Sequence, residues 1–268
     1  MAKYKKRARE LQHDKFRDAA GRIFDRVGDR LEGKGRAILY VLGGLVLAAI
    51  LGGFWVRWSN RKADEARRAL GRAIEIATAP VATAAPTTGE PAPVYATKLE
   101  RSQRAIDEFQ KVAAKYGDPY GAEARYFIAT NMLDLDREKG LNELAEVAKS
   151  DVVEVALLAK FALAQAKEVD GKYDEAAKLY SELAALNNPV VSADGANLRL
   201  ATVYEKQGKK QEAADLLFSI VENSRKQKDA DGLPVSPGAA AREAGEKLQK
   251  LDPERYAKLT PDTPGAPV

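Results

Sequence analysis

The sequence has no cysteine and only one histidine, and both scarcities limit the chemistry available to the chain. Without cysteine there is no disulfide, no thiolate zinc site, no iron–sulfur cluster and no cysteine nucleophile. A histidine-dependent triad or metal site would have to use His13, which lies in a basic segment. Glycine-rich phosphate-binding motifs and paired-histidine zinc motifs do not occur either. We therefore expect a protein that is not an enzyme, with no cofactor, no metal and no small-molecule substrate.

Aromatic residues are also scarce, at 7% of the 268 residues, whereas charged residues make up 31%. Ala, Leu, Glu, Lys and Arg are abundant and β-branched residues are few, which favours helix throughout. The second half of the chain has no alternating pattern of apolar and polar residues, so strands are not indicated. The composition predicts an all-α protein.

Charge is unevenly distributed along the chain. Residues 1–36 hold 12 Lys/Arg and 6 Asp/Glu, residues 37–56 hold no charged residue, and the rest is almost neutral. The high isoelectric point therefore comes from the amino-terminal segment, and we do not expect the body to bind nucleic acid. Apolar residues between Leu11 and Leu31 recur at helical spacing, which predicts a basic amphipathic head over residues 1–36. A membrane surface, a cytoplasmic protein or ribosomal RNA could contact this head.

The uncharged segment, Ala37–Val56, is 20 residues long, about the length of helix that crosses a 30 Å hydrocarbon layer. Tyr40 lies near one end, and Phe54, Trp55 and Trp58 cluster at the other, as in membrane–water interfaces. A buried soluble helix usually carries a polar stripe, and a cleaved signal peptide is usually shorter. The pattern favours a retained transmembrane helix over residues 37–56.

The orientation of this helix is not decided by its immediate flanks, because each set of twenty flanking residues holds six Lys/Arg. Exporting the head would move all twelve positive charges against the membrane potential. We therefore expect a cytoplasmic amino terminus and a body on the other side of the membrane. Gly44, Ala48 and Gly52 share one face of the predicted span, and this spacing of small residues predicts contact with a second helix.

The body, residues 57–260, has the pattern of a helical repeat. The helical stripe at 63–77 is followed by a Pro/Ala/Thr-rich loop at 79–94, and a disordered tail is expected at 261–268. Ala164, Gly171 and Ala176 recur 37 residues later as Ala201, Gly208 and Ala213, within the segments 159–189 and 196–223. Each segment predicts helix, glycine-containing turn and helix, with the alanines at helix crossings. Ser236-Pro237 predicts the start of a last, capping helix.

These segments resemble tetratricopeptide repeats, although the Trp position of the family pattern holds Lys160 or Asn197. Leu200, Ala201 and Tyr204 match the L-G-x2-Y part, and Ala176 and Tyr180 match A-x3-F. The resemblance implies an α-solenoid whose first helices form a concave, peptide-binding face. That face would include Phe161, Gln165, Glu168, Leu198, Thr202 and Glu205.

The whole layout is similar to the tetratricopeptide-like ancillary subunit of the bacterial Sec translocon, over roughly residues 35–250. That resemblance implies a single-pass protein of the bacterial inner membrane with a periplasmic body. Its partners would be the translocon, a membrane-anchored chaperone or prolyl isomerase, and exported clients. The alternative is a cell-envelope scaffold that coordinates cell-wall, division or outer-membrane machinery through the same kind of repeats.

Overall fold

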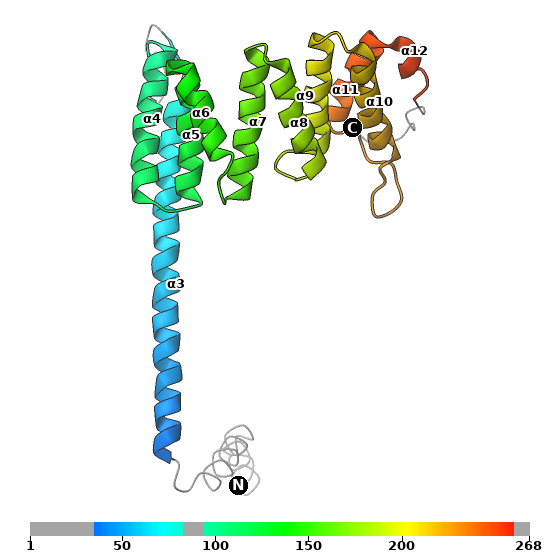
Figure 1. Ribbon diagram of the computed structural model, residues 1–268. Coiled ribbons are helices and arrows are strands. Elements are labelled where there is room, and N and C mark those ends of the chain that lie inside the picture. The colour runs from blue at the N-terminus through cyan, green and yellow to red at the C-terminus, as the bar shows by residue number, and fades with distance from the viewer. Residues whose placement is uncertain (1–34, 83–93, 260–268) are drawn as a thin grey trace, which may run out of the picture. The chain divides into compact units, whose positions relative to one another are not determined.

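The computed structural model describes the backbone of residues 35–82 and 94–259, with side chains from Gly44 onward (Figure 1). Residues 1–34 of the predicted head, most of the loop at 79–94 and the predicted tail lie outside the described residues. The chain divides into two compact units, Met1–Asp64 and Glu65–Val268. Apart from two isolated bridges, the regular structure within the described ranges is helical.

Helix α3 (Gly35–Thr78) contributes to both units. Between Gly44 and Lys62 every described side chain is exposed, including Phe54 at 70% and Trp55 at 66%. Among the described residues, no helix has an apolar stretch long enough to cross a membrane. The predicted span begins at Ala37, and the side chains of residues 37–43 lie outside this description.

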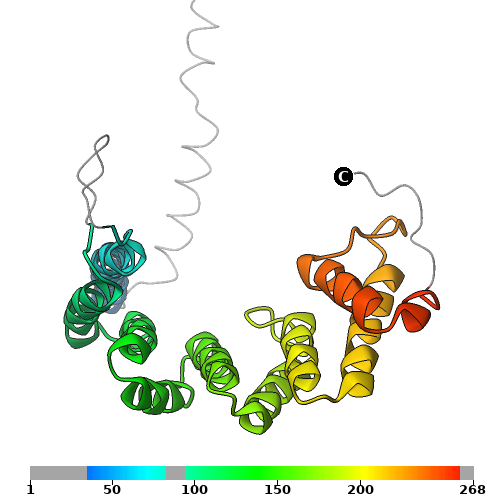
Figure 2. The ribbon, with the colours of Figure 1, turned by 90° about the horizontal axis from the view of Figure 1, so that it is seen from above.

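The second unit contains the end of α3 and a series of helices that alternate in direction (Figure 1). They are α4 (Lys98–Lys115), α5 (Tyr120–Leu135), α6 (Arg137–Val147), α7 (Val153–Val169), α8 (Tyr173–Leu186), α9 (Ala193–Lys206), α10 (Lys210–Lys226), α11 (Ala239–Leu251) and α12 (Pro253–Tyr256). Seen along the helices, α5, α7 and α9 line one side of the row, and α6 and α8 line the other (Figure 2). We call these the inner and the outer side.

The two predicted repeat segments form helix pairs, α7 with α8 and α9 with α10. The predicted crossing residues are fully buried, at 0% exposure in every case: Ala164, Ala176, Ala201 and Ala213. Gly171 and Gly208 lie in the turns with φ of +72° and +76°, a conformation that other L-residues rarely adopt. The prediction of an all-α, tetratricopeptide-like (TPR-like) repeat array is therefore confirmed for this part of the chain.

Side-chain caps explain where several helices begin. The hydroxyl of Thr97 accepts a hydrogen bond from the backbone N–H of Glu100 (3.1 Å), and Ser192 does the same for Gly195 (3.1 Å). Asp136 accepts from the N–H of Lys139 (3.0 Å) at the start of α6. Each cap satisfies a donor that the first turn leaves unpaired, so these short polar residues define the connections.

The predicted stripe at 63–77 supplies the first helix of the earliest pair. Leu70 and Ala73 of α3 share a core with Phe109 of α4, and Phe109 stacks on Phe127 of α5 with ring centroids 4.8 Å apart. The two ends of the inserted loop are held together. The N–H of Ala82 donates to the carbonyl of Tyr95 (3.1 Å), and the N–H of Tyr95 donates to that of Pro80 (3.3 Å).

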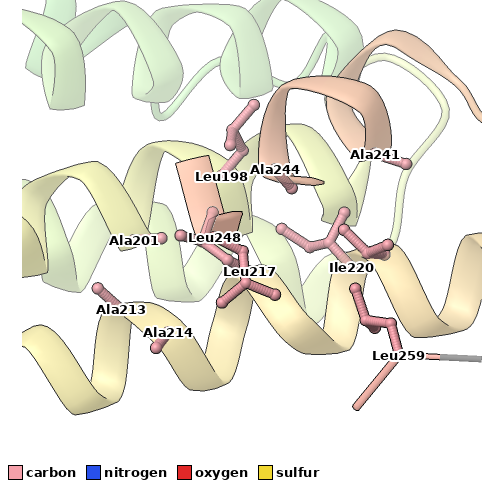
Figure 3. Packing of buried hydrophobic residues seen from close by; sticks show 11 residues of the cluster. Leu198, Ala201, Ala213, Ala214, Leu217, Ile220, Ala241, Ala244, Leu248 and Leu259 are labelled. Carbon is pink, nitrogen blue, oxygen red and sulfur yellow. The ribbon is translucent and has the colours of Figure 1, made fainter. Parts of the chain in front are cut away.

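The last helix pair closes the array around a core between α9, α10 and α11 (Figure 3). The prediction that α11 starts at Ser236-Pro237 is wrong, because α11 begins at Ala239 with Gly238 as its cap. The preceding residues form a hairpin instead, in which the Asp229 carboxylate accepts hydrogen bonds from the N–H groups of Asp231 (3.0 Å) and Leu233 (2.8 Å).

Gly140 permits the close approach of α6 to α5. A Cβ at this position would lie 2.6 Å from the backbone nitrogen of Leu133 and 2.9 Å from its Cα. Backbone atoms cannot move aside as a flexible side chain can, so the two helices would have to separate. Gly245 of α11 offers a contrast, since its Cβ would meet Val221 Cγ2 at an ordinary 3.7 Å.

We predict that Gly140→Ala lowers the free energy of unfolding by about 1–3 kcal/mol, because overpacking outweighs the gain in helix propensity. Gly245→Ala should instead raise it by about 0.5–1 kcal/mol. Urea unfolding of the two full-length variants, followed by circular dichroism, measures both effects. Stabilisation by both alanines would show that α6 and α5 are not packed this closely.

Candidate interaction surface and the ionic cluster beside it

One side of α7 packs against its partner helix, α8. Lys160 pairs with Glu182 of α8 (2.9 Å), and Lys167 pairs with Glu175 of α8 (2.7 Å). The opposite, inner side of α7 carries exposed residues at helical spacing: Glu154, Leu158, Gln165 and Val169. Val169 is 76% exposed, the largest value among the exposed large apolar side chains of the described residues. This side of α7 is open to a partner.

Helix α9 continues this surface. Arg199, Thr202 and Lys206 follow one another at steps of three and four residues, on the side of α9 that faces the end of α7. The Thr202 hydroxyl donates to the Leu198 carbonyl (3.0 Å), so its hydrogen-bonding capacity is used within α9. We define the inner surface as Leu158, Gln165 and Val169 of α7 with Arg199, Thr202 and Lys206 of α9.

A buried carboxylate joins the three helices at the border of the inner surface. Glu168 of α7 is 3% exposed and accepts three hydrogen bonds. The donors are Tyr180 Oη of α8 (3.1 Å), Arg199 Nη2 of α9 (2.6 Å) and Lys206 Nζ of α9 (2.7 Å). The two bonds from Arg199 and Lys206 are short and charge-assisted, which makes them strong. They fix how the α7–α8 pair packs against α9.

The ionisation of this cluster follows from its contacts. Burial alone would raise the pKa of Glu168, but the bonds and charges of Lys206, Arg199 and Tyr180 together lower that pKa below its usual range. Burial, together with the nearby Glu168 carboxylate, raises the pKa of Tyr180 to about 12. At neutral pH the cluster therefore holds one carboxylate, two cations and a neutral phenol, and its net charge is +1.

Three of the residues predicted for a concave face lie on or beside the inner surface. Gln165 is exposed and Thr202 is half-buried. Phe161 is half-buried and packs edge-on against Tyr180, with ring centroids 5.7 Å apart. The structure therefore brings Gln165 and Thr202 together on one side of the array and uses Phe161 mainly to support the cluster.

The other three predicted residues have different environments. Glu168 is the buried carboxylate described above, and Leu198, only 7% exposed, belongs to the core shared by α9, α10 and α11. Glu205 is half-buried, with one carboxylate oxygen 4.0 Å from Lys247 Nζ of α11. The sequence interpretation missed Leu158, Val169, Arg199 and Lys206, although the spacing of the first two along α7 was visible.

The small residues predicted to contact a helix in the membrane are all exposed in this single chain. No atom outside the local helix lies within 4 Å of a Cβ built on Gly44 or Gly52, and Ala48 is exposed as well. Their contact with a second helix remains a prediction. Within residues 35–82 and 94–259, no group of three or more His, Asp or Glu residues is placed to hold a metal ion.

Comparisons with known proteins give no family name. No protein-family model matches the chain, and no curated protein matches it. Two solved structures show the nearly identical TPR-like repeats of a candidate kinesin light chain from Podosopora anserina, one with a single substitution. Each is 18% identical, covers 59% of this chain and 81% of its own, and gives a TM-score of 0.45. The assignment of the fold therefore rests on the helix pairs described above.

The ionic cluster leads to a prediction about pH. The folded-state pKa of Glu168 is lowered, so its contribution to stability is present above the unfolded pKa and is lost as pH falls through the folded one. We expect Glu168→Gln to lower the free energy of unfolding by about 1.5–3 kcal/mol at pH 7. The gap from the wild type should shrink as the pH is taken below about 4.

Glu182→Gln provides the matched control, because the Glu182–Lys160 pair is 42% and 27% exposed. An exposed pair contributes about 0–1 kcal/mol, so this variant should differ little from the wild type. Urea unfolding at pH 7 and at low pH measures both variants. A gap for Glu168→Gln that is constant with pH would contradict the described cluster.

Proposed function

We propose that the array binds polypeptide through its inner surface. The observation that carries this proposal is that the inner surface combines two kinds of side chain. Leu158 and Val169 of α7 are exposed and apolar, and Arg199 and Lys206 of α9 are cations. Apolar groups contribute burial without demanding one sequence, and the cations favour segments that carry acidic residues. Such a mixture suits extended or partly folded chains of varied sequence.

The second part of the proposal is that the chain is anchored in a membrane by Ala37–Val56. Twenty uncharged residues support it, as does the exposure of the described side chains in this segment, from Leu45 at 63% to Val56 at 51%. Water solvates such a surface poorly, whereas lipid accepts it. The basic head would then be cytoplasmic and the array periplasmic, with Gly44, Ala48 and Gly52 available to a neighbouring helix.

The third part concerns the partners. The order of basic head, anchor and TPR-like array resembles the ancillary subunit of the bacterial Sec translocon, which would place the array beside newly exported proteins. A cell-envelope scaffold for cell-wall, division or outer-membrane machinery has the same order of parts and is the second candidate. The two functions differ in which proteins reach the inner surface.

Site-specific photo-crosslinking in cells separates these candidates. A photoreactive phenylalanine analogue at Gln165 of the inner surface should crosslink to exported polypeptides or translocon subunits. The same analogue at Leu99, which is 55% exposed at the start of α4, is the matched control and should give at least about tenfold less product. Crosslinks from Gln165 to cell-wall or division enzymes would favour the scaffold. Equal product at both positions would rule out the inner surface.

The proposed orientation gives a separate expected result. Protease added to spheroplasts with intact inner membranes should digest the array and leave the head, because only the array would be outside the membrane. Epitope tags at the two ends of the chain show in one gel whether the head and the array are digested. Protection of the carboxyl-terminal epitope in these preparations would contradict the orientation, whatever the partners are.

A further inference from the structure

The alternation of helix directions gives the second unit two edges. Arg137 at the start of α6 donates a hydrogen bond to Asp170 at the end of α7 (2.5 Å). Gln207 at the end of α9 donates one to Asp174 at the start of α8 (2.8 Å). These ends form the far edge. The near edge holds the connections α4–α5, α6–α7, α8–α9 and α10–α11 (Figure 1). Helix α3 enters the unit at this edge, where Glu65 lies 3.9 Å from Lys115.

The turns of the far edge are densely charged. Four of the seven residues 168–174 are charged, and so are four of the seven residues 205–211. In the α5–α6 turn, four of the five residues 134–138 are charged. Charge at this density keeps these turns hydrated, although the far edge also exposes Val169 (76%) and Leu99 (55%).

Two stretches of the near edge have a different composition, although its connections also hold Lys149, Asp151, Lys228, Asp229 and Asp231. No charged residue occurs from Leu186 to Ala193, across the α8–α9 connection, or from Gly232 to Ala241, before and into α11. These stretches contribute exposed apolar side chains: Leu186 at 56%, Val190 at 37%, Leu233 at 60% and Val235 at 41%. Val153, at the start of α7, adds a further one at 56%. In a chain that is 31% charged, five exposed apolar side chains on three successive connections form a candidate contact surface.

The hairpin before α11 holds its apolar residues in an ordered position. Its two sides meet at the bridge between Lys228 and Pro234, and the N–H of Val235 donates to the Gln227 carbonyl (3.2 Å). Gly232 adopts φ +78° and, with the bonds to Asp229, sets the turn. Leu233 and Val235 therefore project from a structured turn, which lowers the entropy lost when they are buried.

We propose that the near edge lies against the lipid headgroup region of the membrane, with the apolar side chains of successive connections dipping into it. This inference rests on the proposed membrane anchor and goes beyond it, because an anchor alone would leave the array free of the surface. The apolar residues come from three separate connections along one edge. A flat, extended surface fits that distribution better than a single peptide.

The length of α3 allows this contact. Glu65 at the near edge lies only nine positions after Val56, the end of the uncharged segment. A helical segment of that length spans about 13 Å, comparable to the thickness of one headgroup layer with its bound water. Amide and aromatic groups, such as Asn187, Asn188 and Tyr116 at the same edge, are compatible with the interface.

The absence of cysteine makes a direct test possible. Single-cysteine variants of the full chain are reconstituted in nanodiscs of phosphatidylcholine and phosphatidylglycerol and carry a nitroxide label. The near-edge positions are Leu186 and Leu233, the far-edge controls are Val169 and Leu99, and Leu47 reports the anchor. All five side chains are exposed, so labelling should leave the fold unchanged, as circular dichroism can verify.

Oxygen concentrates in lipid, whereas a nickel chelate stays in water, so the ratio of their effects on the label reports lipid contact. We expect this ratio to be at least about threefold higher at Leu186 and Leu233 than at Val169 and Leu99, and highest at Leu47. A lipid signal at Leu47 with equal, water-like ratios at the other four positions would overturn the near-edge contact and leave the anchor intact.

A water-like ratio at Leu47 would overturn the anchor and the near-edge contact together. Low accessibility of Leu186 and Leu233 to both reagents would mean that protein covers this edge, which also contradicts the proposal. The positions on the far edge provide the comparison within the same chain, since their side chains are as exposed in the structure as those on the near edge.

Discussion

Close helix crossing is the constraint on which the array depends. Ala164, Ala176, Ala201 and Ala213 have no exposed surface, so helices at these points approach as nearly as a methyl group allows. Larger side chains such as Tyr180 and Leu217 then fill the space on either side of the crossings. The position of every exposed residue on α7 and α9 follows from these contacts, because rotating a helix would remove its alanine from the crossing.

The sequence predicted this part of the fold because its signals are local and repeated. A spacing of 37 residues between equivalent alanines and glycines identifies the helix pairs without knowledge of their neighbours. The buried state of Glu168 could not be predicted in that way, because it depends on cations that lie 31 and 38 residues further along the chain. Leu198 was likewise assigned to the predicted concave face. The sequence located its helix but did not define the rotation of that helix about its own axis.

The inner surface and the near edge place different chemistry on different sides of one compact unit. The inner surface combines apolar groups with the cations that bind Glu168, so its charge is coupled to the packing of the repeats. The near edge carries apolar groups on connections and at the ends of helices. Val191 of the α8–α9 connection is buried in the core, whereas Val190, Leu233 and Val235 are exposed and free to vary in composition.

The joined ends of the α3–α4 connection have a consequence for protein engineering. Two backbone hydrogen bonds hold Pro80 and Ala82 against Tyr95. The two ends of the connection therefore stay together whatever sequence lies between them. Once the ends are fixed, doubling the length of the intervening segment costs only about 0.6 kcal/mol of closure entropy. A reporter domain with adjacent termini could therefore be spliced in at this point, and the repeat array would carry it as a passenger.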